Sequence, residues 1–192
     1  MSSPQSETKL LHATASALDA QRDKLPRVHA PFRLPEPIAV GRQITELGRS
    51  ITELGNEYLI RAAAPAPQEH TVLTAAFGNA VGGVAQAASA LGTVAQQLAF
   101  IAHSADRRGE PGCEGEHTRA GQLVECAVET ARDDLAEASQ ALRDAATTVS
   151  PAPAPLRQAA LARSPSAATR NSSPSAMTAP TSPARPALAR AR

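Results

Sequence analysis

Aromatic residues are nearly absent from this chain. Its 192 residues include one Tyr, three Phe and no Trp, so aromatic side chains make up 2% of the composition. Much of the 42% that counts as hydrophobic is alanine, which is the best helix former but buries little surface. A β-sandwich, a barrel or a large α/β domain needs bulkier side chains in its core. The composition therefore argues against those folds and favours long alanine-rich helices.

Cysteine is almost as scarce. The two cysteines, Cys113 and Cys126, are too few for a disulfide framework in a chain of this length. With His103 and His117 they form the one group that has metal-ligand chemistry, but the spacing fits neither of the common zinc patterns. His117 and Cys126 lie about half a revolution out of phase on a helix. We therefore expect no metal site and no cofactor, a loop thiol at Cys113 and an ordinary helical cysteine at position 126.

Acidic residues are absent after Asp144, although the whole chain has 18 of them against 19 basic residues. Residues 150–192 consist mainly of Pro, Ser, Ala and Arg and cannot bury enough apolar surface to offset their ordering entropy. We predict a disordered basic tail there. Its positive charge suits contacts with nucleic-acid phosphates, although it has no aromatic residue for base stacking. The tail's arginines are Arg157, Arg163, Arg170, Arg185, Arg190 and Arg192.

The first 36 residues have a weaker pattern. Residues 1–25 carry a sparse apolar spacing at helical intervals, which predicts a short helix that either docks on the rest or stays mobile. Prolines then crowd residues 26–36, and each removes a backbone donor and disfavours helix before it, so we predict a linker. Glu7 precedes the first basic residue and no uninterrupted apolar run follows, which makes a poor secretory signal. We expect a cytoplasmic location.

From Pro37 onward the pattern becomes regular. Gly-Arg-Gln-Ile-Thr-Glu-Leu at 41–47 is followed by Gly-Arg-Ser-Ile-Thr-Glu-Leu at 48–54. Apolar residues recur at steps of four and three, with Ile and Leu alternating as two-stranded coiled coils favour. This spacing predicts a helix over 37–64 that presents an interaction seam. The seam residues are Ile44, Leu47, Ile51, Leu54 and Tyr58.

Three glycines, Gly41, Gly48 and Gly55, also recur every seven residues in this segment. A glycine inside a helix costs about 1 kcal/mol relative to alanine. We favour the interpretation that this stripe allows another helix to approach closely, which offsets that cost. The alternative is a solvated face left over from duplication of the repeat.

Two further helices are predicted over 68–106 and 115–149, joined by a short loop that favours an antiparallel hairpin. The first has no Asp, Glu, Lys or Arg between Glu69 and Asp106. Because a surface helix of this length normally has a charged face, we expect it to be surrounded by other helices, by copies of itself or by lipid. The second has an apolar seam and a charged opposite face, which we expect to be solvated.

The sequence offers little for catalysis. It has no glycine-rich phosphate loop between a strand and a helix, and an alanine-rich bundle gives little room for a pocket with perturbed acids and bases. We predict a non-catalytic interaction or scaffold protein that packs with itself or with a partner helix. The alternatives are a nucleic-acid-associated protein that uses the tail, and a membrane- or granule-surface protein that uses the uncharged helix. Asn and Gln residues within that helix disfavour a membrane span.

Overall fold

Four helices form between the proline-containing connections of the chain. The computed structural model describes residues 4–26, 33–63, 68–105 and 113–150, all within one compact unit. Every regular element in these ranges is helical, which confirms the predicted all-α class. The helices are α1 (Pro4–Lys24), α2 (Pro37–Ala62), α3 (Gln68–His103) and α4 (Cys113–Val149).

The number of packed helices corrects the sequence prediction, which had three main helices rather than four. The boundaries agree to within about three residues, as helix ends usually do. The helix α2 begins at Pro37 because a proline fits the first turn, and Glu36 before it is extended with φ −70° and ψ 129°. Apart from Ser150, the predicted disordered tail lies outside the described residues.

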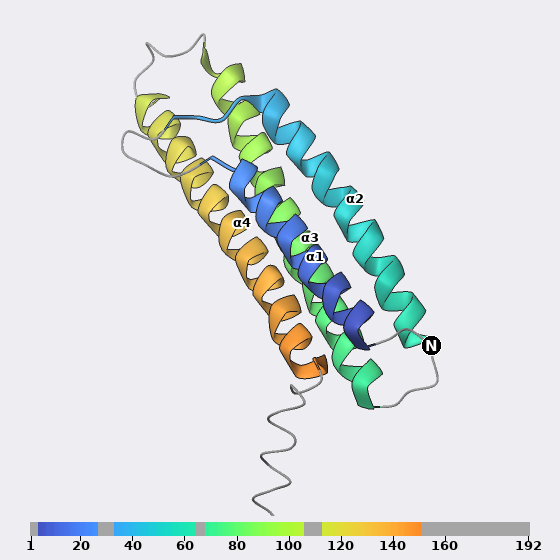
Figure 1. Ribbon diagram of the computed structural model, residues 1–192. Coiled ribbons are helices and arrows are strands. Elements are labelled where there is room, and N and C mark those ends of the chain that lie inside the picture. The colour runs from blue at the N-terminus through green and yellow to red at the C-terminus, as the bar shows by residue number, and fades with distance from the viewer. Residues whose placement is uncertain (1–3, 27–32, 64–67, 106–112, 151–192) are drawn as a thin grey trace, which may run out of the picture. The chain divides into compact units, whose positions relative to one another are not determined.

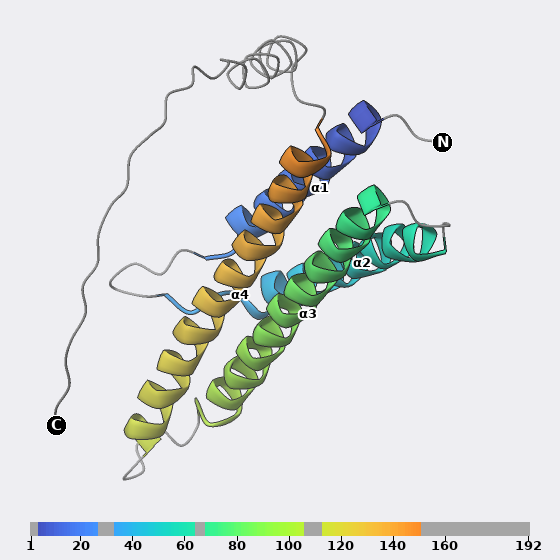
Figure 2. The same ribbon diagram turned by 90° about the horizontal axis from the view of Figure 1, so that it is seen from below.

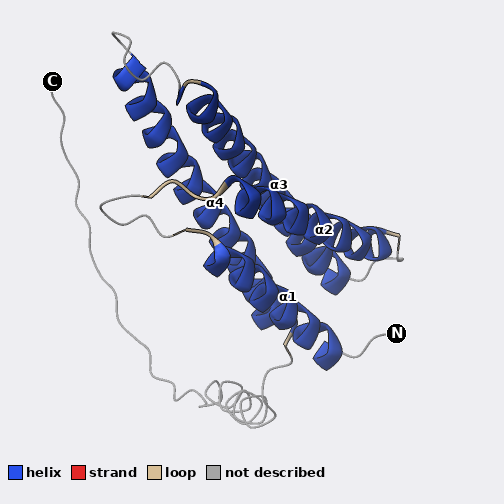
Figure 3. Cartoon of the chain, turned by 90° about the horizontal axis from the view of Figure 1, so that it is seen from above, coloured by secondary structure: helices blue, strands red, loops and turns tan. Residues whose placement is uncertain are grey.

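Consecutive helices run in opposite directions (Figure 1). The most extensive contact joins α3 to α4, while α2 packs on α3 and α1 packs on α4. Figures 2 and 3 show the resulting two pairs, α1 beside α4 and α2 beside α3. The edge between α1 and α2 is the weakest of the bundle.

The core takes side chains from all four helices, which compensates for the small size of each contribution. Leucine, valine and alanine fill it, with one aromatic ring at Phe77. Large side chains that are fully buried come from α1 at Leu11, from α2 at Leu47, from α3 at Leu91 and from α4 at Leu135. Side chains of α1 and α2 thus add buried apolar surface to the alanine-rich interface between α3 and α4.

The docking of α1 corrects in part the expectation that the charged face of α4 is solvated. Asp19 of α1 pairs with Arg143 and accepts a hydrogen bond from buried Ser139 at 3.0 Å. Arg132 donates to the backbone carbonyls of Arg22 and Leu25 at 3.1 and 3.0 Å. These two carbonyls lie at the C-terminal end of α1, where the helix dipole favours a positive charge. The polar residues of α4 are therefore partly a binding face for α1.

The helix α3 carries no Asp, Glu, Lys or Arg after Glu69 and is only partly enclosed by the other helices of the chain. Its apolar stripe faces α2 and α4, whereas Asn79, Gln86, Ser89, Thr93 and Gln96 are exposed or lie on its outer side. Amide and hydroxyl groups hydrogen-bond to water without carrying charge. A charged face is therefore not required for this helix to meet solvent.

The closest approach of α3 and α4 occurs at Gly83. A Cβ atom at this position would lie 3.0 Å from the Cβ of Ala138 and 3.1 Å from the backbone oxygen of Asp134. The absence of a side chain at Gly83 therefore lets the two helices pack backbone to backbone. Its neighbour Gly82 is exposed, and a Cβ there would meet nothing within 4 Å.

These neighbouring glycines predict opposite effects on stability. Gly82→Ala should raise the free energy of unfolding by up to about 1 kcal/mol, because alanine is the better helix former. Gly83→Ala should lower the free energy of unfolding, because the added methyl group forces α3 and α4 apart. Urea denaturation followed by circular dichroism measures both effects. Stabilisation by both substitutions would contradict the close contact at Gly83.

The docking of α1 is tested by a second matched pair. Leu11 is fully buried whereas Leu10, beside it, is 36% exposed. Leu11→Ala should lower the free energy of unfolding by about 2–5 kcal/mol, as expected for a buried leucine, and Leu10→Ala by much less. Thermal and urea denaturation check this difference. Equal small effects would mean that α1 is not part of the cooperative bundle.

Candidate interaction surfaces

The predicted interaction seam of α2 faces the interior of the bundle. Leu47 and Leu54 are buried, and Ile44 and Ile51 are half-buried against the same core. Tyr58 at the end of this seam is the exception: it is 39% exposed, and its ring lies beside α3, where a Cβ added at Gly78 would be 3.4 Å from it. The chain's own helix α3 therefore occupies the surface that the repeat pattern assigns to a partner.

The close contact predicted for Gly41, Gly48 and Gly55 is not made with any part of the chain that the structure describes. A Cβ atom added at any of the three would meet nothing within 4 Å. The reason is geometric, since α3 packs against the adjacent strip of α2 that contains Ile44 and Ile51. The glycines consequently turn away from the bundle.

These glycines belong to an uncharged surface that we call the outer α2 face. Ile38 and Leu59, near its two ends, are each 62% exposed. The hydroxyls of Thr45 and Thr52 donate to backbone carbonyls one turn earlier at 3.0 Å, so that their bonding is satisfied locally. The outer α2 face consists of Ile38, Gly41, Thr45, Gly48, Thr52, Gly55 and Leu59.

The edge between α1 and α2 is closed by side chains at one end. Gln43 of α2 donates to the side-chain oxygen of Gln21 at 2.9 Å and to its backbone oxygen at 3.2 Å. Lys24 pairs with Glu46 at 2.5 Å. The hydrogen bond and charge of Lys24 hold the pKa of the Glu46 carboxyl below its usual value.

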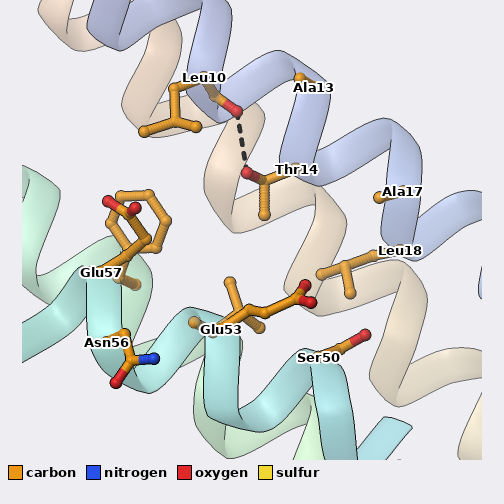
Figure 4. Close-up of a pocket in the computed structure, with 11 residues that line it drawn as sticks. Leu10, Ala13, Thr14, Ala17, Leu18, Ser50, Glu53, Asn56 and Glu57 are labelled. Carbon is orange, nitrogen blue, oxygen red and sulfur yellow. Dashed lines mark hydrogen bonds between the residues drawn. The ribbon is translucent and has the colours of Figure 1, made fainter. Parts of the chain in front are cut away.

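Towards the other end the same edge opens into a groove of about 450 Å³. The labelled side chains of α1 and α2 line its opposite walls (Figure 4). Phe77 of α3 also lines it, and the guanidinium of Arg61 stacks on that ring at 4.4 Å from the centroid. The groove residues are Leu10, Ala13, Thr14, Ala17, Leu18, Ser50, Glu53, Leu54, Asn56, Glu57 and Phe77.

The cysteine and histidine residues also take unexpected places. Cys113 is buried in the first turn of α4 and is not a loop thiol. The Ser104 hydroxyl uses its single proton to donate to the Phe100 carbonyl at 2.7 Å. The Ser104 Oγ atom therefore accepts a hydrogen bond from Nε2 of His117, at 2.6 Å. The Nδ1 atom of His117 faces the Cys113 sulfur at 4.0 Å. This cluster links the end of α3 to the start of α4.

Cys126 is exposed and is absent from the hydrogen bonds of this cluster. Within the described ranges, no group of three or more His, Cys, Asp and Glu side chains is placed to hold a metal ion. The cluster around His117 offers one imidazole and one thiol, fewer ligands than zinc requires.

An acidic hollow of about 410 Å³ lies between α3 and α4, opened by the small residues around Gly83. Asp134 and Glu137 line it together with Asn79 and Gln86. Burial raises the pKa of the Asp134 carboxyl above its usual value, and the carboxylates of Glu137 and Asp133 raise it further.

The two alternative functions, nucleic-acid binding and membrane association, each depend on one segment of the chain. The tail arginines Arg157, Arg163, Arg170, Arg185, Arg190 and Arg192 lie outside the described residues. Residues His70–His103 of α3 are long and apolar enough to cross a membrane by length and composition, with a mean hydropathy of 1.2 over an 18-residue window. A core helix of a soluble bundle meets the same criterion, and α3 contacts both α2 and α4.

Comparison of the chain with protein-family models, with curated proteins and with solved structures found no match.

Neutralising Asp134 should stabilise the protein at neutral pH. A carboxyl whose pKa is raised by folding binds more protons in the folded state, so its contribution to stability falls as pH rises. At pH values above the pKa of Asp134 in the folded protein, the Asp134→Asn variant should therefore have a higher free energy of unfolding than the wild type. This advantage should disappear below the usual pKa of 3.8. Urea denaturation across pH checks it, with exposed Glu129→Gln as the control, and a pH-independent difference would contradict it.

Proposed function

We propose that this protein is a non-catalytic helical interaction module that packs against a helix of a second copy or of a partner protein. The predicted seam of Ile44, Leu47, Ile51, Leu54 and Tyr58 stabilises the module itself. The outer α2 face is then the surface offered to the partner.

The observation that carries this proposal is the exposure of Ile38, Leu59 and Ile60, at 62%, 62% and 66%. Leu59 and Ile60 are neighbours at one end of α2, and Ile38 lies about 30 Å away at the other end, so a partner helix would have to run along the whole outer α2 face to cover the exposed apolar side chains at both ends. Between Ile38 and Leu59 the face holds only glycine and threonine. Small residues allow two helix axes to approach at the lower end of the usual 8–10 Å range.

The order of residues suits an antiparallel pair of α2 helices. Ile38 and Leu59 stand at the two ends of the outer α2 face, and Thr45 and Thr52 stand symmetrically between them. In an antiparallel pair with two-fold symmetry, Ile38 of each copy lies beside Leu59 of the other. The two threonines pair in the same way. The same patch thus serves both copies, as an isologous interface requires.

Light scattering after size-exclusion chromatography tests this pairing. The wild type should shift from monomer to dimer across the micromolar range, and Leu59→Glu should keep it monomeric because a carboxylate would be buried against the partner. Leu123→Glu is the matched control, since Leu123 is exposed on α4. A wild type that is monomeric throughout, or a Leu123→Glu variant that dissociates equally, would contradict self-pairing through α2.

A further inference from the structure

We propose that the groove between α1 and α2 binds a small organic cation that has an apolar body. This site is separate from the outer α2 face and does not depend on the function proposed for that face. It combines an apolar base, an acidic rim and a restricted length, and each of these features selects one property of the ligand.

The base of the groove selects an apolar body. Leu18, Leu54 and Phe77 line it and are themselves buried from the surface. On the α1 wall, Ala13 and Ala17 are exposed and small, so the space above the base is not filled by the protein's own side chains. Because the base residues are already buried, an apolar group placed there would mainly cover the exposed surface of Leu10, Ala13 and Ala17 and remove it from water together with its own.

The rim selects a single positive charge. Glu53 and Glu57 line the groove, and none of the described residues that line it is a lysine, arginine or histidine. Arg61 already pairs with Glu57, whereas Glu53 has no ion pair among the described residues. In Figure 4 the carboxylate of Glu53 points toward α1, above the groove. Beside an apolar surface an amine there would be held more strongly than in open solvent.

The length of the groove selects a small molecule over a helix. Its α1 wall runs from Leu10 to Leu18, which at the rise of an α-helix is about 12 Å. The contacts of Gln21 with Gln43 and of Lys24 with Glu46 close the edge beyond it. A volume of about 450 Å³ falls within the range of small-molecule sites, roughly 300–1,000 Å³.

Calorimetric titration of the full chain with 4-phenylbutylammonium tests the proposal, with uncharged 4-phenylbutanol as the comparison ligand. The amine should bind saturably, and more tightly than the alcohol by roughly fivefold, as expected for one partly exposed charge pair. NMR shift changes should centre on residues 10–18 and 50–57. Equal affinity for the two ligands, or no saturable binding up to millimolar amine, would overturn the proposal.

Variants then locate the site. Glu53→Gln should weaken amine binding roughly fivefold and leave alcohol binding unchanged, whereas Glu129→Gln on α4 should change neither. Ala17→Leu should abolish both by filling the groove, with circular dichroism confirming that the exposed substitution preserves the fold. Unchanged binding in Ala17→Leu would place the ligand elsewhere and overturn the proposal. It would also fail if protein concentration alone shifted the resonances of the α1 wall, residues 10–18, which lie outside the outer α2 face, because a second copy would then be the occupant.

Discussion

The close approach of α3 and α4 at Gly83 is the contact on which the rest of the bundle depends. It is the most extensive helix pair, and Gly83 admits the backbone of Asp134 where any side chain would intrude. The remaining two helices attach to its opposite flanks, α2 to α3 and α1 to α4. Because many core side chains are small, the leucines that α1 and α2 add to those of the central pair enlarge the buried apolar surface.

This arrangement explains why the candidate surfaces lie on α1 and α2. Each of these helices packs mainly on its own half of the central pair, and polar contacts such as Gln21 with Gln43 join them near the C-terminal end of α1. The groove opens beside these contacts, between residues 10–18 of α1 and 50–57 of α2. The outer α2 face exists for a related reason, since α3 covers only the strip of Ile44 and Ile51. Both surfaces therefore arise because α1 packs mainly on α4 and α2 packs mainly on α3.

Periodicity predicted the three main helices because apolar residues spaced by three and four leave a clear pattern, and a sparser pattern predicted a short helix over residues 1–25. It left open whether that helix docks, because the partner face of α1 on α4 contains Arg132 and Arg143 and resembles a solvated surface. It also assigned close packing to a repeated glycine such as Gly48, whereas the contact glycine is the unrepeated Gly83. The groove has no sequence signal, because its presence depends on the distance between two helices rather than on the spacing within one.

The central contact is tested most directly by nuclear Overhauser spectroscopy of the full chain. The Cβ of Ala138 lies 3.0 Å from the position that a Cβ would take on Gly83. The account predicts a strong cross-peak between the α-protons of Gly83 and the methyl group of Ala138, and a weaker one or none from Gly82. A spectrum in which Ala138 contacts Gly82 instead, or contacts no residue of α3, would contradict the account.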